Sequence, residues 1–170
     1  SGVPSNSARL SLADSSILVI DDNDGVRTAF DVLMSLHGAR VRGAASPVEG
    51  LDILEKEPVD LVIQDMNFRR EATSGEEGVQ LFHQIRKRHE DVPIILLTAW
   101  THLETAIELV KAGATDYIAK PWDDARLLTT VRNLLDLRRA RAESIRIQAQ
   151  RRQARRALAE RFDLRGAVYE

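Results

Sequence analysis

Ile17-Leu18-Val19-Ile20-Asp21-Asp22 is a run of four apolar residues that ends in two acids. Three later apolar runs also lead to a polar residue: Leu61-Val62-Ile63 before Asp65, Ile94-Ile95-Leu96-Leu97 before Thr98, and Tyr117-Ile118-Ala119 before Lys120. Short apolar runs of this kind are typical of strands buried on both faces of a parallel sheet. The carboxyl ends of parallel strands share one edge, where open α/β sheets bind ligands. The sequence therefore predicts that three carboxylates, a hydroxyl and an ammonium group meet in one crevice.

Strand and helix patterns alternate five times along the chain. Gly38 is expected to end the first helix, and Ser46-Pro47 to begin the second with an N-cap and an N1 proline. Capping boxes are predicted to open the third and fourth helices, at Ser74-x-x-Glu77 and Thr101-x-x-Glu104. Asp123 is the expected cap of the last helix. Strands joined by single helices cross over right-handed, which predicts an α/β fold with a doubly wound, five-stranded parallel sheet.

Composition excludes several classes of protein and site. The 170 residues include no cysteine, so disulfides, thiolate zinc sites and cysteine nucleophiles are impossible. No apolar stretch approaches the ~20 residues of a membrane span, and no secretory signal precedes the first strand. Residues 1–14 are rich in Ser, with Gly and Pro, and are expected to form a flexible lead-in. We expect a cytoplasmic protein with no membrane partner.

Charge is distributed unevenly along the chain. Residues 1–124 carry 12 basic against 21 acidic side chains, whereas residues 125–170 carry 12 arginines against 5 acids. The change in sign indicates an acidic domain followed by a basic extension. Neither Gly nor Pro occurs between Asp123 and Arg165, so the last helix is expected to continue through a linker over residues 138–160.

Apolar residues recur at 3-4 spacing along this extension and predict a dimer seam made of Leu128, Val131, Leu135 and Ile145. Such a seam favours a short coiled coil and a homodimer. A solvated or disordered linker beyond about Arg146 is the alternative. The many arginines also raise the possibility of nucleic-acid binding. The linker over residues 138–160 has no aromatic residue and no recognisable DNA-binding fold, so we expect no direct DNA contact.

The predicted crevice is suited to a divalent cation and a phosphoryl group. Three carboxylates held together raise one another's pKa unless a cation compensates, and Mg²⁺ accepts such oxygen ligands while keeping several waters. Lys120 offers a compact positive charge for a phosphoryl oxygen, and Thr98 offers a hydroxyl donor. Asp65 follows the central apolar strand and can act as a nucleophile that forms an aspartyl phosphate.

These residues, taken as Ile20-Asp21-Asp22, Asp65, Thr98-Ala99 and Lys120-Pro121, resemble the receiver domain of bacterial two-component response regulators over about residues 16–137. The resemblance implies a flavodoxin-like receiver fold over residues 15–137 and phosphorylation of Asp65 by a sensor histidine kinase.

The resemblance also implies roles for single residues. Mg²⁺ would be bound directly by Asp22 and Asp65, through water by Asp21, and by the backbone carbonyl of Asn67. Tyr117 matches the aromatic switch residue of the family and would act together with Thr98.

The loop after Asp65 departs from the family pattern. Receivers usually place a glycine about eight residues after the phosphorylated acid, whereas the matching residue here is Gly78, which makes the loop over residues 66–77 longer. Long loops in compact domains tend to be functional or mobile. The insertion leaves the acidic residues intact, but the docking of a kinase beside it cannot be inferred.

The last ten residues, 161–170, resemble the start of the ATPase domain in NtrC-type, sigma-54-dependent activators, where an aromatic-x-Leu-x-Gly segment follows a helical linker. The resemblance implies that an output ATPase domain follows in a longer chain. No Walker motif occurs within the 170 residues, so this part is expected to catalyse only its own phosphorylation and dephosphorylation.

Other readings remain open at this point. The chain could carry a different output domain, could be a phosphoaspartyl hydrolase, or could be a dimerisation module that is never phosphorylated. The three acids could be solvated turn residues, Thr98 a helix cap, Lys120 a surface charge and Tyr117 ordinary core. Trp100 could shield a phosphoryl group or simply pack. The cognate kinase, the stimulus, the target genes and the sign of regulation do not follow from the sequence.

Overall fold

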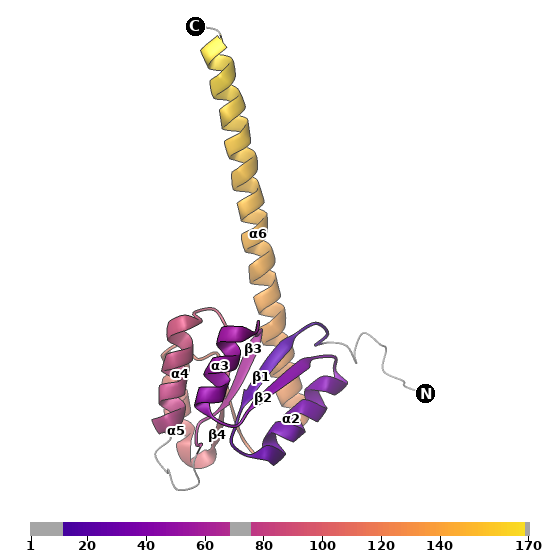
Figure 1. The fold of residues 1–170 in the computed structure, drawn as a ribbon, viewed down its shortest axis with the longest axis vertical. Coiled ribbons are helices and arrows are strands. Elements are labelled where there is room, and N and C mark those ends of the chain that lie inside the picture. The colour runs from indigo at the N-terminus through magenta and orange to yellow at the C-terminus, as the bar shows by residue number, and fades with distance from the viewer. Residues whose placement is uncertain (1–11, 69–75, 169–170) are drawn as a thin grey trace, which may run out of the picture. The chain divides into compact units, whose positions relative to one another are not determined.

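A computed structural model describes residues 12–68 and 76–168 of the chain, with side chains as far as Asp163. Its sheet is parallel throughout and has the order β2-β1-β3-β4-β5. The first four of these strands are labelled in Figure 1. The strands are β1 (Ser16–Ile20), β2 (Arg40–Ala44), β3 (Leu61–Asp65), β4 (Ile94–Ala99) and β5 (Asp116–Lys120). The helices are α2 (Asp24–Leu36), α3 (Pro47–Lys56), α4 (Glu76–Arg88), the 3₁₀ turn η1 (Trp100–His102), α5 (Leu103–Lys111) and α6 (Asp124–Val168). The predicted α/β fold with five parallel strands and a long C-terminal helix is confirmed.

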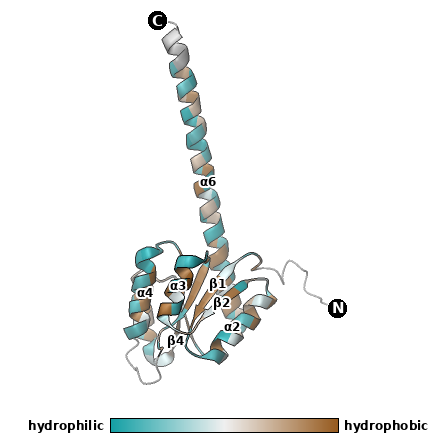
Figure 2. Ribbon diagram, in the orientation of Figure 1, coloured by the Kyte–Doolittle hydropathy of each residue, from teal (hydrophilic) through white to brown (hydrophobic). Residues whose placement is uncertain are grey.

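Two apolar layers cover the sheet, one on each face. Buried residues of α2 and of the first part of α6 pack on one face, around Phe30 and Leu127. On the other face α3, α4 and α5 contribute a second cluster, around Ile53 and Phe82. Figure 2 shows brown concentrated on the inner strands of the sheet and the helices mixed in colour, as expected when each helix turns one apolar side to a sheet.

Most of the predicted helix ends are confirmed. The Ser46 hydroxyl accepts a hydrogen bond from the N–H of Glu49 at 3.2 Å, and the Asp123 carboxylate accepts one from the N–H of Ala125 at 2.8 Å. Gly38 has φ +93°, a conformation that favours glycine after a helix. The capping box at Ser74 lies outside the described residues, as does the lead-in as far as residue 11.

The predicted cap at Thr101 is wrong. A 3₁₀ turn over Trp100–His102 leads into α5, so His102 occupies the cap position and makes no side-chain capping bond. The chain continues to turn directly after β4, and this places Thr101 inside the first turn instead of ahead of it. The short 3₁₀ segment replaces the capping box as the start of this helical region.

The predicted dimer seam is also wrong in part. Val131 and Leu135 are 0% and 3% exposed within the core between α6 and the sheet, and Leu128 packs against the same cluster while half-buried. Apolar residues at 3-4 spacing pack on the sheet here, so Val131 and Leu135 cannot face a second chain. Ile145 is the exception among the four, with 63% of its side chain exposed.

The chain divides into two units, Ser1–Leu135 and Asp136–Glu170. The first contains the sheet and all the helices up to the start of α6. The second is helical over its described residues, and its arginine-rich surface is exposed. No helix among the residues that the structure describes is both long and apolar enough to cross a bilayer.

An aromatic pair joins α2 to the chain just ahead of α6. The rings of Phe30 and Trp122 stack with their centroids 4.7 Å apart and an interplanar angle of 22°. The indole N–H of Trp122 donates to the Asp124 carboxylate at 3.0 Å, so its polar atom is satisfied while the ring is half-buried. The pair fixes the start of α6 against α2.

Candidate functional site

The strand ends bring the predicted residues to one edge of the sheet. Asp21 follows β1, Asp65 is the last residue of β3, and Lys120 is the last residue of β5. Carboxylate oxygens of Asp21, Asp22 and Asp65 all lie within 4.8 Å of one another. This is the cluster that the sequence predicts from residues up to 44 positions apart.

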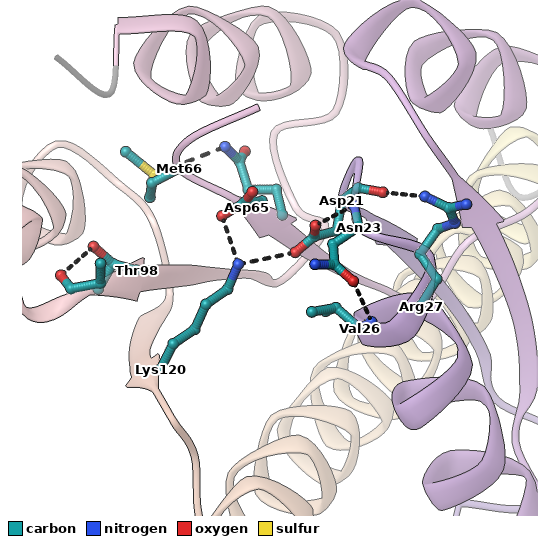
Figure 3. Close-up of polar contacts among 10 residues, drawn as sticks. Asp21, Asn23, Val26, Arg27, Asp65, Met66, Thr98 and Lys120 are labelled. Atoms are coloured by element: carbon teal, nitrogen blue, oxygen red, sulfur yellow. Dashed lines mark hydrogen bonds and ion pairs between the residues drawn. The ribbon is translucent and has the colours of Figure 1, made fainter. Parts of the chain in front are cut away.

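Lys120 lies between two of these acids, Asp21 and Asp65. Its Nζ lies 3.1 Å from Oδ1 of Asp65 and 3.2 Å from Oδ2 of Asp21, so a single ammonium group bridges two buried acids (Figure 3). Asp21 and Asp65 are buried, whereas Asp22 is exposed. The peptide bond between Lys120 and Pro121 is cis. The site therefore has two buried acids that share one ammonium group, and a third acid that is open to solvent.

Burial raises the pKa of the Asp65 carboxyl to about 6, and the adjacent Asp21 carboxylate contributes in the same direction. The Lys120 ammonium and a hydrogen bond from the backbone N–H of Asn67 oppose this increase. Burial also raises the pKa of Asp22, with Asp21 again adding to the effect. Negative charge is thus in excess, which is the condition under which a cation binds.

The pKa of Lys120 is raised overall. Burial lowers it, but the carboxylates of Asp65 and Asp21 outweigh that effect. The ammonium form is therefore favoured at neutral pH. A permanent positive charge beside Asp65 is suited to an anionic ligand.

Two residues that the sequence analysis did not single out hold Asp21 in place. The backbone N–H of Asn23 donates to Oδ1 of Asp21 at 2.9 Å, and Arg27 donates to the Asp21 carbonyl at 2.6 Å. Asn23 also caps α2 through the N–H of Val26, and Arg27 forms an ion pair with Asp24. An Asn directly before a helix pattern is a recognisable capping signal. No sequence pattern indicated that Arg27 would contact the Asp21 carbonyl.

Thr98 and Tyr117 lie apart from the carboxylate cluster. Thr98 is fully buried, and its hydroxyl donates to the neighbouring carbonyl of Ala99 at 3.1 Å. Figure 3 shows it to one side of the bridge between Asp65 and Lys120. Tyr117 is half-buried against the core beneath α5. Trp100 is 68% exposed, so its ring lies largely in solvent.

Asn67 lies beside the phosphoacceptor candidate. Its backbone N–H contacts the Asp65 carboxylate, and its side-chain Oδ1 is buried without a hydrogen-bond partner within the described ranges. The residue is half-buried and follows Met66, which is fully covered. The chain that leaves β3 therefore stays against the Asp65 carboxylate through the Asn67 N–H.

Comparison with known proteins identifies the family. The family model of the response regulator receiver domain matches residues 17–132. This range includes all three acids of the cluster and every strand residue except Ser16. The chain belongs to the response regulator receiver family. Its match extends well into the first part of α6, and the resemblance drawn from the sequence is confirmed.

Named relatives support this assignment. The chain is 33% identical over 126 residues to the response regulator protein PilR of Pseudomonas aeruginosa, covering 74% of this chain and 27% of that protein. It is 30% identical over 157 residues to the C4-dicarboxylate transport transcriptional regulatory protein DctD of the same organism, covering 92% and 31%. The chain thus spans less than a third of the length of either relative.

Solved structures show the same receiver fold. The N-terminal signal receiver domain of a Bacteroides fragilis response regulator superposes with a TM-score of 0.65 at 36% identity, over 71% of this chain and 96% of that one. NtrX from Brucella abortus gives a TM-score of 0.67 at 26% identity, over 76% and 28%. Receiver domains generally bind Mg²⁺ at an acidic cluster, and the three acids of this receiver form such a cluster.

Proposed function

We propose that this receiver accepts a phosphoryl group on Asp65 from a sensor histidine kinase. The observation that carries the proposal is the Lys120 ammonium, 3.1 Å from Asp65 and 3.2 Å from Asp21. Asp65 is nearly fully buried and is the last residue of β3, the central strand of the sheet. Among the described strands, no other inner strand ends in an acid. A positive charge held there favours arrival of an anionic group.

The reaction is a transfer between two nucleophiles. An Asp65 carboxylate oxygen forms a bond to phosphorus as the phosphorus–nitrogen bond of the kinase phosphohistidine breaks, and the electron pair stays on the imidazole. Lys120 contacts the phosphoryl oxygens and compensates their charge. Mg²⁺, when bound by Asp21, Asp22, Asp65 and the Asn67 carbonyl, would supply further positive charge to those oxygens. The receiver catalyses its own phosphorylation and dephosphorylation and turns over no other substrate.

Signal transmission uses residues that lie apart from the acids in this structure. Once Asp65 carries a phosphoryl group, the Thr98 hydroxyl leaves the Ala99 carbonyl and donates to that group. Tyr117 then turns into the space that Thr98 vacates. Both changes bias the surface of α5 and β5, and α6 carries the change to an output domain.

The output is that of a sigma-54-dependent transcription activator in the cytoplasm. Two observations support this proposal: the similarity to PilR and DctD over less than a third of their length, and the resemblance of residues 161–170 to the start of an NtrC-type ATPase domain. The receiver is proposed to act as a homodimer. Since Val131 and Leu135 are buried in its own core, pairing would use Ile145 and its neighbours in the second part of α6.

Labelling with a small phosphodonor tests the proposal. Incubation with acetyl phosphate and Mg²⁺ should add one phosphoryl group, measured as intact mass, and Asp65→Asn should abolish the addition. Asp52→Asn is the matched control, because Asp52 is an exposed acid paired with Lys56 in α3. Retention of the label in Asp65→Asn would refute the assignment. Steady turnover of a generic phosphate ester would instead support a phosphoaspartyl hydrolase.

A further inference from the structure

Gln64 is a buried polar side chain directly before the proposed phosphoacceptor. It is 0% exposed within β3, and Val62 and Met66, two positions to either side, belong to the apolar core that α4 covers. Residues two apart on a strand share a face, so the Gln64 side chain enters the same layer. An amide placed in an apolar layer requires hydrogen-bond partners.

The partner of Gln64 is the beginning of α4. Its Nε2 donates to the carbonyl of Gly78 at 2.8 Å, across 14 positions of the chain. A weak second contact reaches the sulfur of Met66 at 4.0 Å. The bond therefore fastens the third residue of α4 to the strand that ends in Asp65.

Gly78 also rests directly on the backbone of Met66. A Cβ at Gly78 would lie 2.5 Å from both the Cα and the carbonyl oxygen of Met66, so no other residue fits without a shift. On its other side, the N–H of Met66 donates to the carbonyl of Leu97 in β4 at 3.0 Å. Met66 is thus held between β4 and the first turn of α4.

This arrangement controls the peptide that follows. Met66 leads to Asn67, whose N–H contacts the Asp65 carboxylate and whose carbonyl is the proposed Mg²⁺ ligand. The Oε1 of Gln64 has no partner in the described part of the chain. A buried acceptor without a partner reduces stability, and this cost offsets part of what the bond from Nε2 contributes. The glutamine must be explained by what its other atom, Nε2, does.

We propose that Gln64 is a positioning residue for phosphorylation of Asp65. Its bond to Gly78 keeps the first turn of α4 on Met66, and so fixes the Asn67 peptide that completes the metal site. This inference rests on the proposed function, since it assigns a role toward Mg²⁺ and Asp65. Gln64 touches neither the metal nor the phosphoryl group and acts through Met66 and Asn67.

Gln64→Met tests the role, because methionine has nearly the same length but no donor. Mg²⁺ affinity of the full chain, measured by calorimetry, should fall roughly three- to tenfold, since the Asn67 peptide must then be ordered on binding. Hydrogen exchange of the Asn67 amide, measured by NMR without Mg²⁺, should become faster. The melting temperature should be unchanged or higher, and saturating Mg²⁺ should restore the rate of labelling by acetyl phosphate.

Gln84→Met is the matched control, because Gln84 is an exposed residue of α4 that undergoes the same change. A second variant, Gly78→Ala, pushes α4 off Met66 and should shift Mg²⁺ affinity and Asn67 exchange in the same direction as Gln64→Met. Equal shifts in the Gln84 control would overturn the inference.

Other outcomes separate this inference from the proposed function. Unchanged Asn67 exchange and Mg²⁺ affinity in Gln64→Met would overturn the inference alone. Faster exchange throughout β1 and β3 together with a lower melting temperature would also overturn it, in favour of a purely structural role. A wild-type chain that neither binds Mg²⁺ nor accepts a phosphoryl group would overturn the proposed function, and with it the role assigned to Gln64.

Discussion

The two parts of α6 share one helical backbone but have different surroundings. Up to Leu135 the helix turns Leu127, Val131 and Leu135 into the receiver core, where they are almost completely buried. Beyond Asp136 the large apolar side chains that the structure describes are exposed, from 38% at Ile147 to 76% at Phe162. Apolar residues at 3-4 spacing show which side of a helix is covered, but they do not show whether the same chain or another covers it.

Different forces must stabilise the two parts. Burial of each large apolar side chain in the first part contributes about 1.5–3 kcal/mol. The second part has good helix formers and contacts such as that of Arg146 with Glu143 at 2.6 Å, and each such pair contributes only about 0.2–0.5 kcal/mol. The first part is thus an integral element of the receiver, whereas the second would gain most of its stability from a partner.

An acid placed in each part gives the largest contrast. Val131→Asp should reduce the free energy of unfolding by more than about 4 kcal/mol, because it buries an unpaired carboxylate in the core. Ile145→Asp, at an exposed site, should change that free energy by no more than about 0.5 kcal/mol. Urea denaturation followed by circular dichroism measures both. Equal losses would show that the two parts are not distinct.

The charge of Asp65 gives a smaller and pH-dependent effect on the receiver unit. Because the folded-state pKa of Asp65, about 6, exceeds its ordinary value of 3.8, ionisation of this group costs stability. The cost is absent below the unfolded-state pKa, grows as pH rises between the two values, and is complete above about 6. Asp65→Asn should therefore raise the free energy of unfolding by about 1–2 kcal/mol at pH 7.5. This figure allows for the ion pair with Lys120 that the substitution removes.

Melting curves at pH 7.5 and pH 4 check this expectation, with Asp52→Asn as the control for loss of an exposed acid. The advantage of Asp65→Asn should shrink at the lower pH, and the control should show no such trend. A larger stabilisation by Asp65→Asn at pH 4 than at pH 7.5 would contradict a raised pKa of Asp65 in the folded state.

The cap of α6 gives a third, smaller effect. Asp123→Ala removes an acceptor for the N–H groups of Ala125 and Arg126, at 2.8 and 3.3 Å, and should destabilise the receiver by about 1 kcal/mol. Asp163→Ala, an exposed acid in the second part, is the control and should leave the melting temperature unchanged. Identical melting temperatures for Asp123→Ala and wild type would show that the cap does not contribute.

Ile145 gives the smallest effect on a single chain and the clearest test of pairing. Sedimentation with and without beryllofluoride should show a homodimer whose affinity or geometry shifts with this phosphoryl mimic. Ile145→Asp should weaken the dimer, because a charge would enter the paired surface. A monomer in both states at high micromolar concentration would rule out the proposed dimer.

The sequence was most informative where a residue's role depends on its own strand. Apolar runs ending in Asp21, Asp65 and Lys120 predict both the parallel sheet and the meeting of these groups, because parallel strands place their ends together. The bridge from Lys120 to two acids follows from the same topology. The caps at Ser46 and Asp123 are local, and they too could be predicted.

Features that depend on packing between elements could not be predicted in this way. Whether Val131 faces the sheet or a second chain depends on the position of α6, which no local pattern records. The cap at Thr101 is absent because the 3₁₀ turn after β4 begins at Trp100, two residues earlier than a capping box at Thr101 requires. The bond from Gln64 to Gly78 joins residues that are separated by the insertion, so neither position signals the other.

The stacked pair of Trp122 and Phe30 provides an intrinsic fluorescence probe in this receiver. Trp122 lies two residues after Lys120, with its ring half-buried and its N–H bonded, whereas Trp100 is 68% exposed. Since these are the only two tryptophans of the chain, a soluble quencher such as acrylamide separates their emission. Changes at the acids that reach Lys120 and the following Pro121-Trp122 segment are expected to alter Trp122 emission in the native chain, without a dye or a labelled phosphodonor.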